Sequence, residues 1–276
     1  MKIYYTERNF DELTPGILQK ENHEVYVPKE DVEDVHTFGR PELIATLKEI
    51  KPDVLVVGLK FIIDQEIIDC APIKAIFTRT TATDHITAQG VEIYSLRGED
   101  LSDVVAVPEL TIGMAIYLMR TMYDIGFELR GKKIGLIGYG RIGRLLDEYA
   151  VAFKMHIYYY DKNKPEYSLD ELLKNADIVS LHVTADESNR NFMDMEKFKM
   201  MKEGSWFLNP SRPWLVDDEA LKWALDNRLA GAWVDFDMPF THDHLITTPH
   251  LGGRTYESSI KTERIIRDKI LSWSKK

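Results

Sequence analysis

The sequence predicts an α/β protein made of two doubly wound domains, each built on a parallel sheet, with a cleft between them. Strand-like apolar runs alternate with helical segments along the chain of 276 residues, which is the pattern of parallel sheets covered on both faces. The run Val54–Val57 is apolar at every position, as a strand buried on both faces should be. A glycine-rich turn at 138–143 joins another such run to an amphipathic helix. The alternation falls into two blocks, near 1–101 and 102–253, which we expect to be the two domains.

The first block begins with short strands and has no glycine-rich loop. We expect its strands at 3–5, 25–27, 54–57, 74–78 and 91–94. Helices should begin at Pro41, follow Asp64 as N-cap, and cover 84–89 before Gly90. After this block, a helix from about Ser102 to Tyr123 is apolar nearly all round, which indicates packing between domains or between subunits.

The second block repeats the alternation with clearer helix signals. Its strands are expected at 133–137, 156–160, 177–181, 205–209, 229–234 and 245–248. Ser168 and Glu171 form a capping box, and Asp217 can cap the helix that follows it. Further helices are expected over 194–201 and 255–273.

The turn at 138–143 has the spacing of a dinucleotide-binding loop. Gly138 would allow the sharp turn, Gly140 would let the backbone approach a pyrophosphate, and Gly143 would let the helix pack on its strand. The strand at 156–160 ends in Asp161, which would place a carboxylate near a ribose diol. The alternatives are a βα turn that binds nothing and an aspartate that ends a strand in solvent, but the combination favours a cofactor site.

The composition excludes several classes of partner. The formal net charge of −10 disfavours a nucleic acid or an anionic membrane, although a small anionic substrate can still bind a locally basic site. Cys70 is the only cysteine, so no internal disulfide can form, and we expect a cytoplasmic protein. No signal-like segment, no membrane-length apolar run and no metal-ligand pattern is found in the sequence.

Polar residues follow several strands of the second block, at the edge where open α/β sheets bind ligands. They are His182, Asn209 with Ser211 and Arg212, Asp235 with Asp237, and His250. Each has an ordinary structural explanation: a satisfied histidine, a solvated arginine, an aspartate that caps a turn. Their shared edge, next to the glycine turn, makes a functional site an equally strong interpretation.

Five segments resemble the D-isomer-specific 2-hydroxyacid dehydrogenase family. They are GLIGYGRIG at 135–143, DIVSLHV at 177–183, WFLNPSR at 206–212, LVDDEAL at 215–221 and TPHLGG at 248–253. The resemblance implies two Rossmann-like domains: a substrate domain of 1–101 plus 254–276, completed by the C-terminal helix, and an NAD-binding domain of 102–253. It also implies a homodimer, with the helix at 102–123 contributing to the interface.

The resemblance assigns roles residue by residue. Arg212 matches the arginine that grips the 2-oxo acid, and a guanidinium can bind a carboxylate and polarise the carbonyl beside it. His250 matches the general acid, a role that suits histidine because an imidazole ordinarily titrates near working pH. Asp235 matches the aspartate that holds the nicotinamide carboxamide, and Lys60 lies where the family contacts the substrate carboxylate. The remaining implied cofactor contacts are Gly138, Gly140, Arg141, Ile142, Gly143, Asp161, His182, Val183, Asn209, Arg212 and Thr111.

The sequence departs from the family pattern in three places. The family has a glutamate before a proline, paired with the catalytic histidine, whereas Met238 precedes Pro239 here and Asp237 is the candidate replacement. Pro213 replaces the glycine after Arg212 and should hold that arginine extended. The glycine-rich substrate loop reads TTATDH at 80–85, which predicts a non-standard substrate pocket.

Two functions remain open at this point. The first is an NAD-linked oxidoreductase acting on a small 2-oxo or 2-hydroxy acid, with a glycerate- or hydroxypyruvate-like substrate. The second is an NAD(H)-binding sensor or interaction protein of the same fold with little turnover, which the missing glutamate keeps open.

Overall fold

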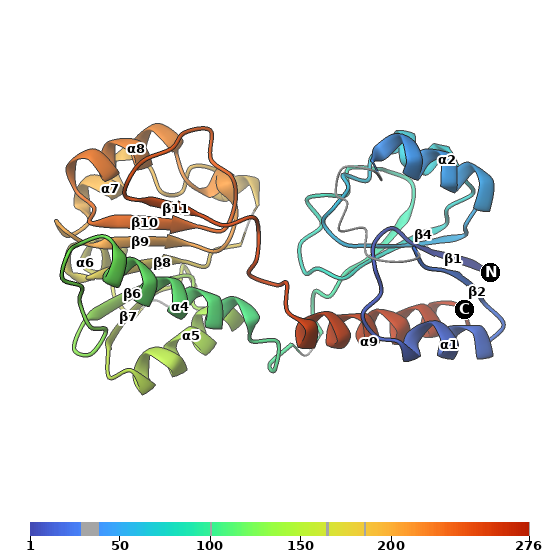
Figure 1. The fold of residues 1–276 in the computed structure, drawn as a ribbon, viewed down its shortest axis with the longest axis horizontal. Helices are drawn as coiled ribbons and strands as arrows, with labels where there is room; N and C mark the ends of the chain where they lie inside the picture. Colours follow the sequence, from blue (N-terminus) through green and yellow to red (C-terminus); the bar gives the residue numbers. More distant parts are fainter. Residues whose placement is uncertain (29–38, 100, 164–165, 185, 276) are drawn as a thin grey trace. The chain divides into compact units, whose positions relative to one another are not determined.

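The computed structural model describes residues 1–28, 39–99, 101–163, 166–184 and 186–275. The chain forms two compact units, unit 1 (Met1–Val104 and Thr255–Lys276) and unit 2 (Val105–Arg254). In both units, helices cover the two faces of a parallel sheet (Figure 1). The predicted fold class is therefore confirmed. No helix in the described part of the chain combines the length and apolarity needed to cross a membrane.

Unit 1 contains a five-stranded parallel sheet in the order β2-β1-β3-β4-β5. The strands are β1 (Lys2–Tyr5), β2 (Glu24–Tyr26), β3 (Val54–Val57), β4 (Ala75–Thr78) and β5 (Glu92–Tyr94). Its helices are α1 (Leu13–Lys20), α2 (Arg40–Ile50), α3 (Gln65–Asp69) and α9 (Tyr256–Trp273). The strand order reverses direction between β1 and β3.

The sheet of unit 1 is buried on both faces because its strands supply side chains to two separate cores. Leu55 and Ile76 face the core that contains Leu43 and Leu47 of α2. The other core holds alternate strand residues together with Leu18 of α1 and with Ile266 and Ile270 of α9. Ile266 and Ile270 are four residues apart and so lie on one face of α9. This face packs on the sheet of unit 1, so the last helix of the chain covers the first sheet.

Unit 2 contains a six-stranded parallel sheet in the order β11-β10-β9-β8-β6-β7. The strands are β6 (Lys133–Ile137), β7 (His156–Tyr160), β8 (Ile178–Leu181), β9 (Trp206–Asn209), β10 (Gly231–Val234) and β11 (Leu245–Thr247). Its α-helices are α4 (Ala106–Thr121), α5 (Arg141–Ala152), α6 (Leu169–Asn175), α7 (Met195–Met200) and α8 (Asp218–Asn227). The strand order reverses between β6 and β8.

The helices of unit 2 divide between the two faces of its sheet. On one face, Leu172 of α6, Phe198 of α7 and Leu221 of α8 pack in one core. On the other, Leu118 of α4 and Leu146 of α5 pack in a second core. Residues of the central strands, such as Leu181 and Leu208, belong to these cores, so the loops that follow the strands leave from buried elements.

Three sequence-based expectations about helices were wrong, each for a local reason. The predicted helix at 84–89 is a turn, because Ile86 bridges Ile63 and the His85 imidazole lies 3.1 Å from the Thr78 hydroxyl. The helix expected from Ser102 begins at Ala106, because Pro108 lacks an N–H and fits only the first helical turn. Helix α1 was not predicted, because its Pro-Gly pair at 15–16 reads as a turn.

Candidate active site

Gly138 lies where the strand order of unit 2 reverses, the position at which open α/β sheets bind ligands. Its φ of +94° is in the left-handed region that favours glycine. A Cβ at this position would lie 2.6 Å from the carbonyl carbon and oxygen of His182. The loops after β6 and β8 therefore touch, and only a glycine permits that approach.

Gly140 and Gly143 complete the turn. A Cβ at Gly143 would collide with the carbonyl oxygen of Gly138, so the first turn of α5 packs directly on the loop. A Cβ at Gly140 would meet nothing within 4 Å, and no side chain caps the N-terminus of α5 at this residue. Open space next to the first N–H groups of a helix suits a pyrophosphate. The residues present fit a dinucleotide.

Asp161 lies beside this turn, at the end of β7. Its Oδ2 accepts a hydrogen bond from the Tyr139 N–H at 3.2 Å, and its Oδ1 accepts one from the Asn163 N–H at 2.9 Å. The carboxylate is thus fixed against the loop that would hold the phosphates, at the position from which a ribose diol can be bound. Arg141 and Ile142 start α5 next to the turn, and burial lowers the pKa of the Arg141 guanidinium.

His182 is a half-buried residue with a neutral imidazole. Its Nε2 lies 2.8 Å from the Ser180 hydroxyl, and its buried Nδ1 has no partner among the described residues. Burial lowers the pKa of His182 to about 3, because a charged ring would lose its hydration. Val183 follows it and is half-buried, with its N–H beside Gly138. The backbone of His182 therefore lies against the glycine turn, whereas its Nδ1 is buried away from the surface.

Asn209, at the end of β9, shapes the loop that carries Arg212. Its Nδ2 donates to the Arg212 carbonyl at 3.0 Å, and its Oδ1 accepts from the Ser211 N–H at 2.9 Å. Ser211 in turn donates its hydroxyl to the Leu181 carbonyl at 2.8 Å. Asn209 is fully buried and these bonds give it a positioning role, while its contact with a cofactor stays a prediction.

Arg212 leaves this loop in an extended conformation, with φ −143° and ψ 148°. That is the conformation predicted from Pro213, which starts a short 3-10 turn at Pro213–Leu215. The guanidinium Nη1 donates to the Ser211 carbonyl at 3.0 Å. Backbone and side chain are therefore both oriented by contacts within the loop.

Asp235 follows β10 and holds the loop at 248–252. Its buried carboxylate accepts from the Thr248 hydroxyl at 2.6 Å, the Leu251 N–H at 2.7 Å and the Gly252 N–H at 2.6 Å. The Trp233 indole N–H also donates to the Thr248 hydroxyl, at 2.9 Å. With both oxygens engaged and only 1% of its surface exposed, Asp235 positions the loop, and this part of its role was not predicted. Nor were Trp233 and Thr248 predicted as parts of the site.

His250 lies at the centre of the loop that Asp235 holds. Its φ of +54° is unusual for a residue with a side chain and costs on the order of 1 kcal/mol. The His250 N–H donates to the Thr248 carbonyl at 2.8 Å, and its neighbours Leu251 and Gly252 are fixed by Asp235. The strained conformation persists because these bonds outweigh its cost.

Three further predicted site residues have the following places in the structure. Asp237 is exposed and makes no hydrogen bond or ion pair to His250 in the part of the chain described, so the structure does not support it as the histidine's partner. Thr111 is fully buried and donates its hydroxyl to the Val107 carbonyl at 2.7 Å, and its contact with a cofactor stays a prediction. Lys60 belongs to unit 1, where its backbone N–H donates to Glu7 and its ammonium lies 5.4 Å from the centre of the Phe61 ring.

The fold and the glycine turn of unit 2 define a dinucleotide-binding α/β protein. Residues 117–252 match the sequence model described as D-isomer specific 2-hydroxyacid dehydrogenase, NAD binding domain. A glyoxylate reductase from Thermofilum pendens is 31% identical, over 80% of this chain and 77% of its own length. The chain belongs to the D-isomer-specific 2-hydroxyacid dehydrogenase family, and unit 2 contains its NAD-binding domain.

Other relatives agree with this assignment. A D-3-phosphoglycerate dehydrogenase from Haemophilus influenzae is 32% identical over 83% of this chain, but the chain spans only 62% of that relative's length. Among solved structures, the TT0316 protein from Thermus thermophilus matches with a TM-score of 0.80 and 25% identity, over 98% of this chain and 96% of that one. An NAD⁺-bound 3-phosphoglycerate dehydrogenase from Entamoeba histolytica has the same fold, with a TM-score of 0.83 and 24% identity, over 98% of this chain and 94% of that one.

Proposed function

We propose that this chain is an NAD-dependent oxidoreductase that moves a hydride between NAD(H) and a small 2-oxo or 2-hydroxy acid of the D type. One observation carries the proposal: Arg212 and His250 follow β9 and β11, on either side of β10 and Asp235. They leave the same edge of the sheet as the glycine turn, so an acid-binding cation and a proton donor stand at the cofactor edge.

The proposed roles follow from the chemistry of these groups. NAD(H), when bound, supplies or accepts the hydride. Arg212 binds the substrate carboxylate and polarises the neighbouring carbonyl. His250 gives a proton to the carbonyl oxygen during reduction and takes it back during oxidation. Asp235 keeps the His250 loop in place through its hydrogen bonds to Thr248 and to the backbone.

Unit 2 is proposed to hold the cofactor and unit 1 the substrate. We propose a glycerate- or hydroxypyruvate-like substrate, because the relatives include dehydrogenases of D-3-phosphoglycerate and a reductase of glyoxylate. The test is NADH oxidation with a panel of 2-oxo acids that includes glyoxylate, hydroxypyruvate and its 3-phosphate. Oxidation with at least one of them supports the proposal, and NADH binding without any oxidation contradicts it.

Replacing Arg212 tests the proposed mechanism within the same assay. Arg212→Ala should lower kcat/KM for the 2-oxo acid by about 100-fold, because the substrate loses its charged contact with the guanidinium. This factor corresponds to about 3 kcal/mol of transition-state stabilisation. NADH binding, measured by fluorescence titration, should stay unchanged. Arg228→Ala, on a loop at the opposite edge of the sheet, is the control. Retained kcat/KM in Arg212→Ala would remove this residue from the mechanism.

One observation favours the alternative function, an NAD(H)-binding sensor or interaction protein with little turnover. No glutamate precedes Pro239, and Asp237 makes no bond to His250 among the described residues. In the family that glutamate pairs with the catalytic histidine, so its replacement by Met238 keeps a protein with little turnover open. The same panel of 2-oxo acids separates the two functions.

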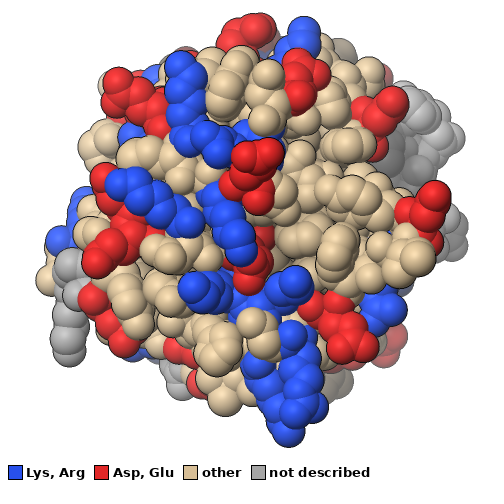
Figure 2. All heavy atoms as spheres, turned by 90° about the vertical axis from the view of Figure 1, so that its left-hand side faces the viewer, with Lys and Arg blue, Asp and Glu red and all other residues tan. Residues whose placement is uncertain are grey.

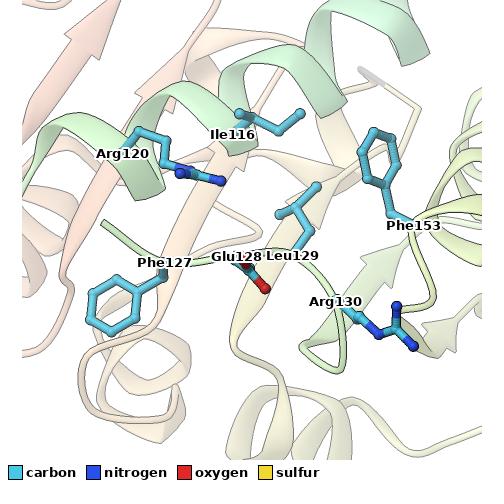
Figure 3. A pocket seen from close by; sticks show the side chains of 7 residues that line it. All are labelled: Ile116, Arg120, Phe127, Glu128, Leu129, Arg130 and Phe153. Atoms are coloured by element: carbon cyan, nitrogen blue, oxygen red, sulfur yellow. The ribbon is translucent and has the colours of Figure 1, made fainter. Parts of the chain in front are cut away.

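We also propose that the chain forms a homodimer through an apolar surface of unit 2. The exposed fractions are 52% for Tyr117, 85% for Ile125, 40% for Phe127 and 42% for Phe153. Arg120 and Ile116 of α4 face the segment 127–130 across a cavity of about 210 Å³ (Figure 3). Phe127 and Phe153 both line this cavity, and exposed apolar side chains near one another support an interaction surface.

Light scattering at micromolar concentration tests this surface. The wild type should have twice the monomer mass, and Ile125→Glu should have the monomer mass because a buried charge would be unpaired at the interface. Leu13→Glu, at another exposed apolar residue, should leave the dimer intact. A monomeric wild type would contradict the proposal.

The absence of nucleic-acid binding and a cytoplasmic location remain predictions. On the face of unit 2 shown in Figure 2, Lys and Arg side chains lie next to Asp and Glu side chains, and no wide field of positive charge is seen. Such a face gives a phosphate backbone little net attraction. The Cys70 thiol is free, as is usual in a reducing compartment.

A further inference from the structure

The cofactor turn of unit 2 carries one side chain between two glycines. Gly138 has a φ of +94°, and a Cβ at Gly140 would meet nothing within 4 Å. Glycines leave the backbone more freedom than other residues do, and a loop that becomes ordered only when a ligand binds lowers the affinity for that ligand. Tyr139 lies between the two glycines, so its side chain is the group that can hold this part of the turn in one conformation.

The side chain of Tyr139 contacts both a neighbouring strand and the helix that follows the turn. Its ring stacks on that of Tyr159 in β7, with 3.8 Å between the ring centroids and 11° between the planes. Its hydroxyl donates a hydrogen bond to the carboxylate of Asp147 in α5. Burial and the neighbouring Asp147 raise the pKa of the Tyr139 phenol, so the hydroxyl stays protonated and continues to donate at neutral pH.

The backbone of Tyr139 is bonded to groups at the cofactor edge. Its N–H donates to Asp161 Oδ2 at 3.2 Å, and its carbonyl accepts from Arg144 Nε at 3.3 Å. The ring of Tyr139 packs against the core that contains Leu146 of α5. The side chain therefore acts on the turn from the interior of unit 2, while the backbone is bonded to the carboxylate that suits a ribose diol.

We propose that Tyr139 is a positioning residue that holds the turn and Asp161 in place for the ADP half of NAD(H). It touches no reacting atom and acts through the backbone of the turn and through Asp161. Order that exists before binding increases affinity, because less conformational freedom is lost when the ligand arrives. The inference deepens the proposed function and rests on its cofactor, but it does not depend on turnover.

The test measures ADP-ribose binding by calorimetry, because this probe carries the pyrophosphate and the ribose diol without the nicotinamide. Tyr139→Leu removes the stacked ring and the hydrogen bond, and it should weaken ADP-ribose binding about tenfold. Tyr139→Phe keeps the ring and should weaken binding only about threefold. Tyr149→Leu, at a half-buried tyrosine farther along α5 that packs against the same core, should bind ADP-ribose as the wild type does.

Discrimination against a 2′-phosphate is a second measurement, which a general loss of stability does not change. Asp161 repels that phosphate, so the wild type should bind ADP-ribose more tightly than ADP-ribose 2′-phosphate. Because Tyr139 donates to Asp161, Tyr139→Leu should lower the ratio of the two dissociation constants about threefold. Tyr139→Phe and Tyr149→Leu should keep the wild-type ratio. Thermal unfolding of each variant verifies that it is folded.

Substitutions in α5 locate the contribution of the hydroxyl. Asp147→Ala should weaken ADP-ribose binding as much as Tyr139→Phe does, and the double variant should bind no more weakly than either, because both changes remove the same hydrogen bond. Glu148→Ala, an equal charge change at the next, exposed residue, should bind as the wild type does. A folded Tyr139→Leu with wild-type affinity for ADP-ribose would overturn the inference, as would an equal loss in Tyr149→Leu or a wild type that does not bind the probe.

The ADP-ribose titration separates this inference from the proposed function. Weaker binding in Tyr139→Leu, in a chain that oxidises NADH with no 2-oxo acid, would contradict the proposed function and support the role of Tyr139. Turnover of a 2-oxo acid with unchanged ADP-ribose binding in Tyr139→Leu would support the proposed function and overturn the role of Tyr139.

Discussion

The hydrogen bonds of Asp235 make a quantitative prediction about the His250 loop. In Asp235→Asn, the amide oxygen can replace only one carboxylate oxygen. If that oxygen keeps the Thr248 hydroxyl and the Leu251 N–H, the new NH₂ group faces the Gly252 N–H, which now bonds to Oδ2 at 2.6 Å. One buried donor is then left unsatisfied against another donor, and the charge that strengthened the remaining bonds is lost.

The cost follows from the burial of this site. An unsatisfied buried donor costs about 1–3 kcal/mol, and bonds to a charged acceptor are worth more than neutral ones. We therefore expect Asp235→Asn to lower the free energy of unfolding of unit 2 by about 2–3 kcal/mol. For a unit of this size, such a change lowers Tm by about 4–12 °C.

Thermal and urea unfolding of the full chain measure this effect. Asp243→Asn, at an exposed position of the same unit, is the matched control and should change the free energy of unfolding by less than about 0.5 kcal/mol. If the chain is active, kcat should also fall in Asp235→Asn, because His250 loses its fixed position. A loss of stability within the range of the control would refute the assignment of Asp235 as the anchor of this loop.

Two further predictions concern buried charge. His182 is neutral in the folded state, with a pKa of about 3 against about 6.5 when unfolded, so its stabilisation is complete above pH 6.5 and is lost as pH falls below that value. The unfolding free energy should therefore drop by about 2 kcal/mol more between pH 7 and pH 5 in the wild type than in His182→Asn. Urea unfolding at pH 7 and at pH 5 measures this difference, and His156→Asn, at an exposed histidine, is the control. Equal drops in the wild type and in His182→Asn would disprove the prediction. Arg79→Met should destabilise the protein by about 3 kcal/mol because buried Glu263 loses its cation. Adding Glu263→Gln should recover part of this loss, and an additive double variant in denaturant unfolding would show that the two side chains are not coupled.

The sequence by itself determined the fold class and the cofactor turn. Both depend on local features: an apolar run such as Val54–Val57 must be buried on both faces, and the spacing of Gly138, Gly140 and Gly143 suits a strand, a tight turn and a helix. Pro213 likewise fixed the backbone of Arg212 through a steric effect on its immediate neighbour, and the structure has Arg212 extended. In each case the physical constraint acts within a few residues.

Only the tertiary structure decided which polar side chains face one another. Asp235 could be predicted at a strand end, but its bonds to Thr248, Leu251 and Gly252 depend on the pairing of β10 with β11. Asp237, two residues away, is exposed, because a side-chain direction in a loop is set by distant packing and not by spacing. Glu7 accepts a hydrogen bond from the Lys60 N–H and forms an ion pair with Arg79, and both residues lie more than fifty positions away in the chain. The sequence alone does not distinguish such a paired carboxylate from a solvated one.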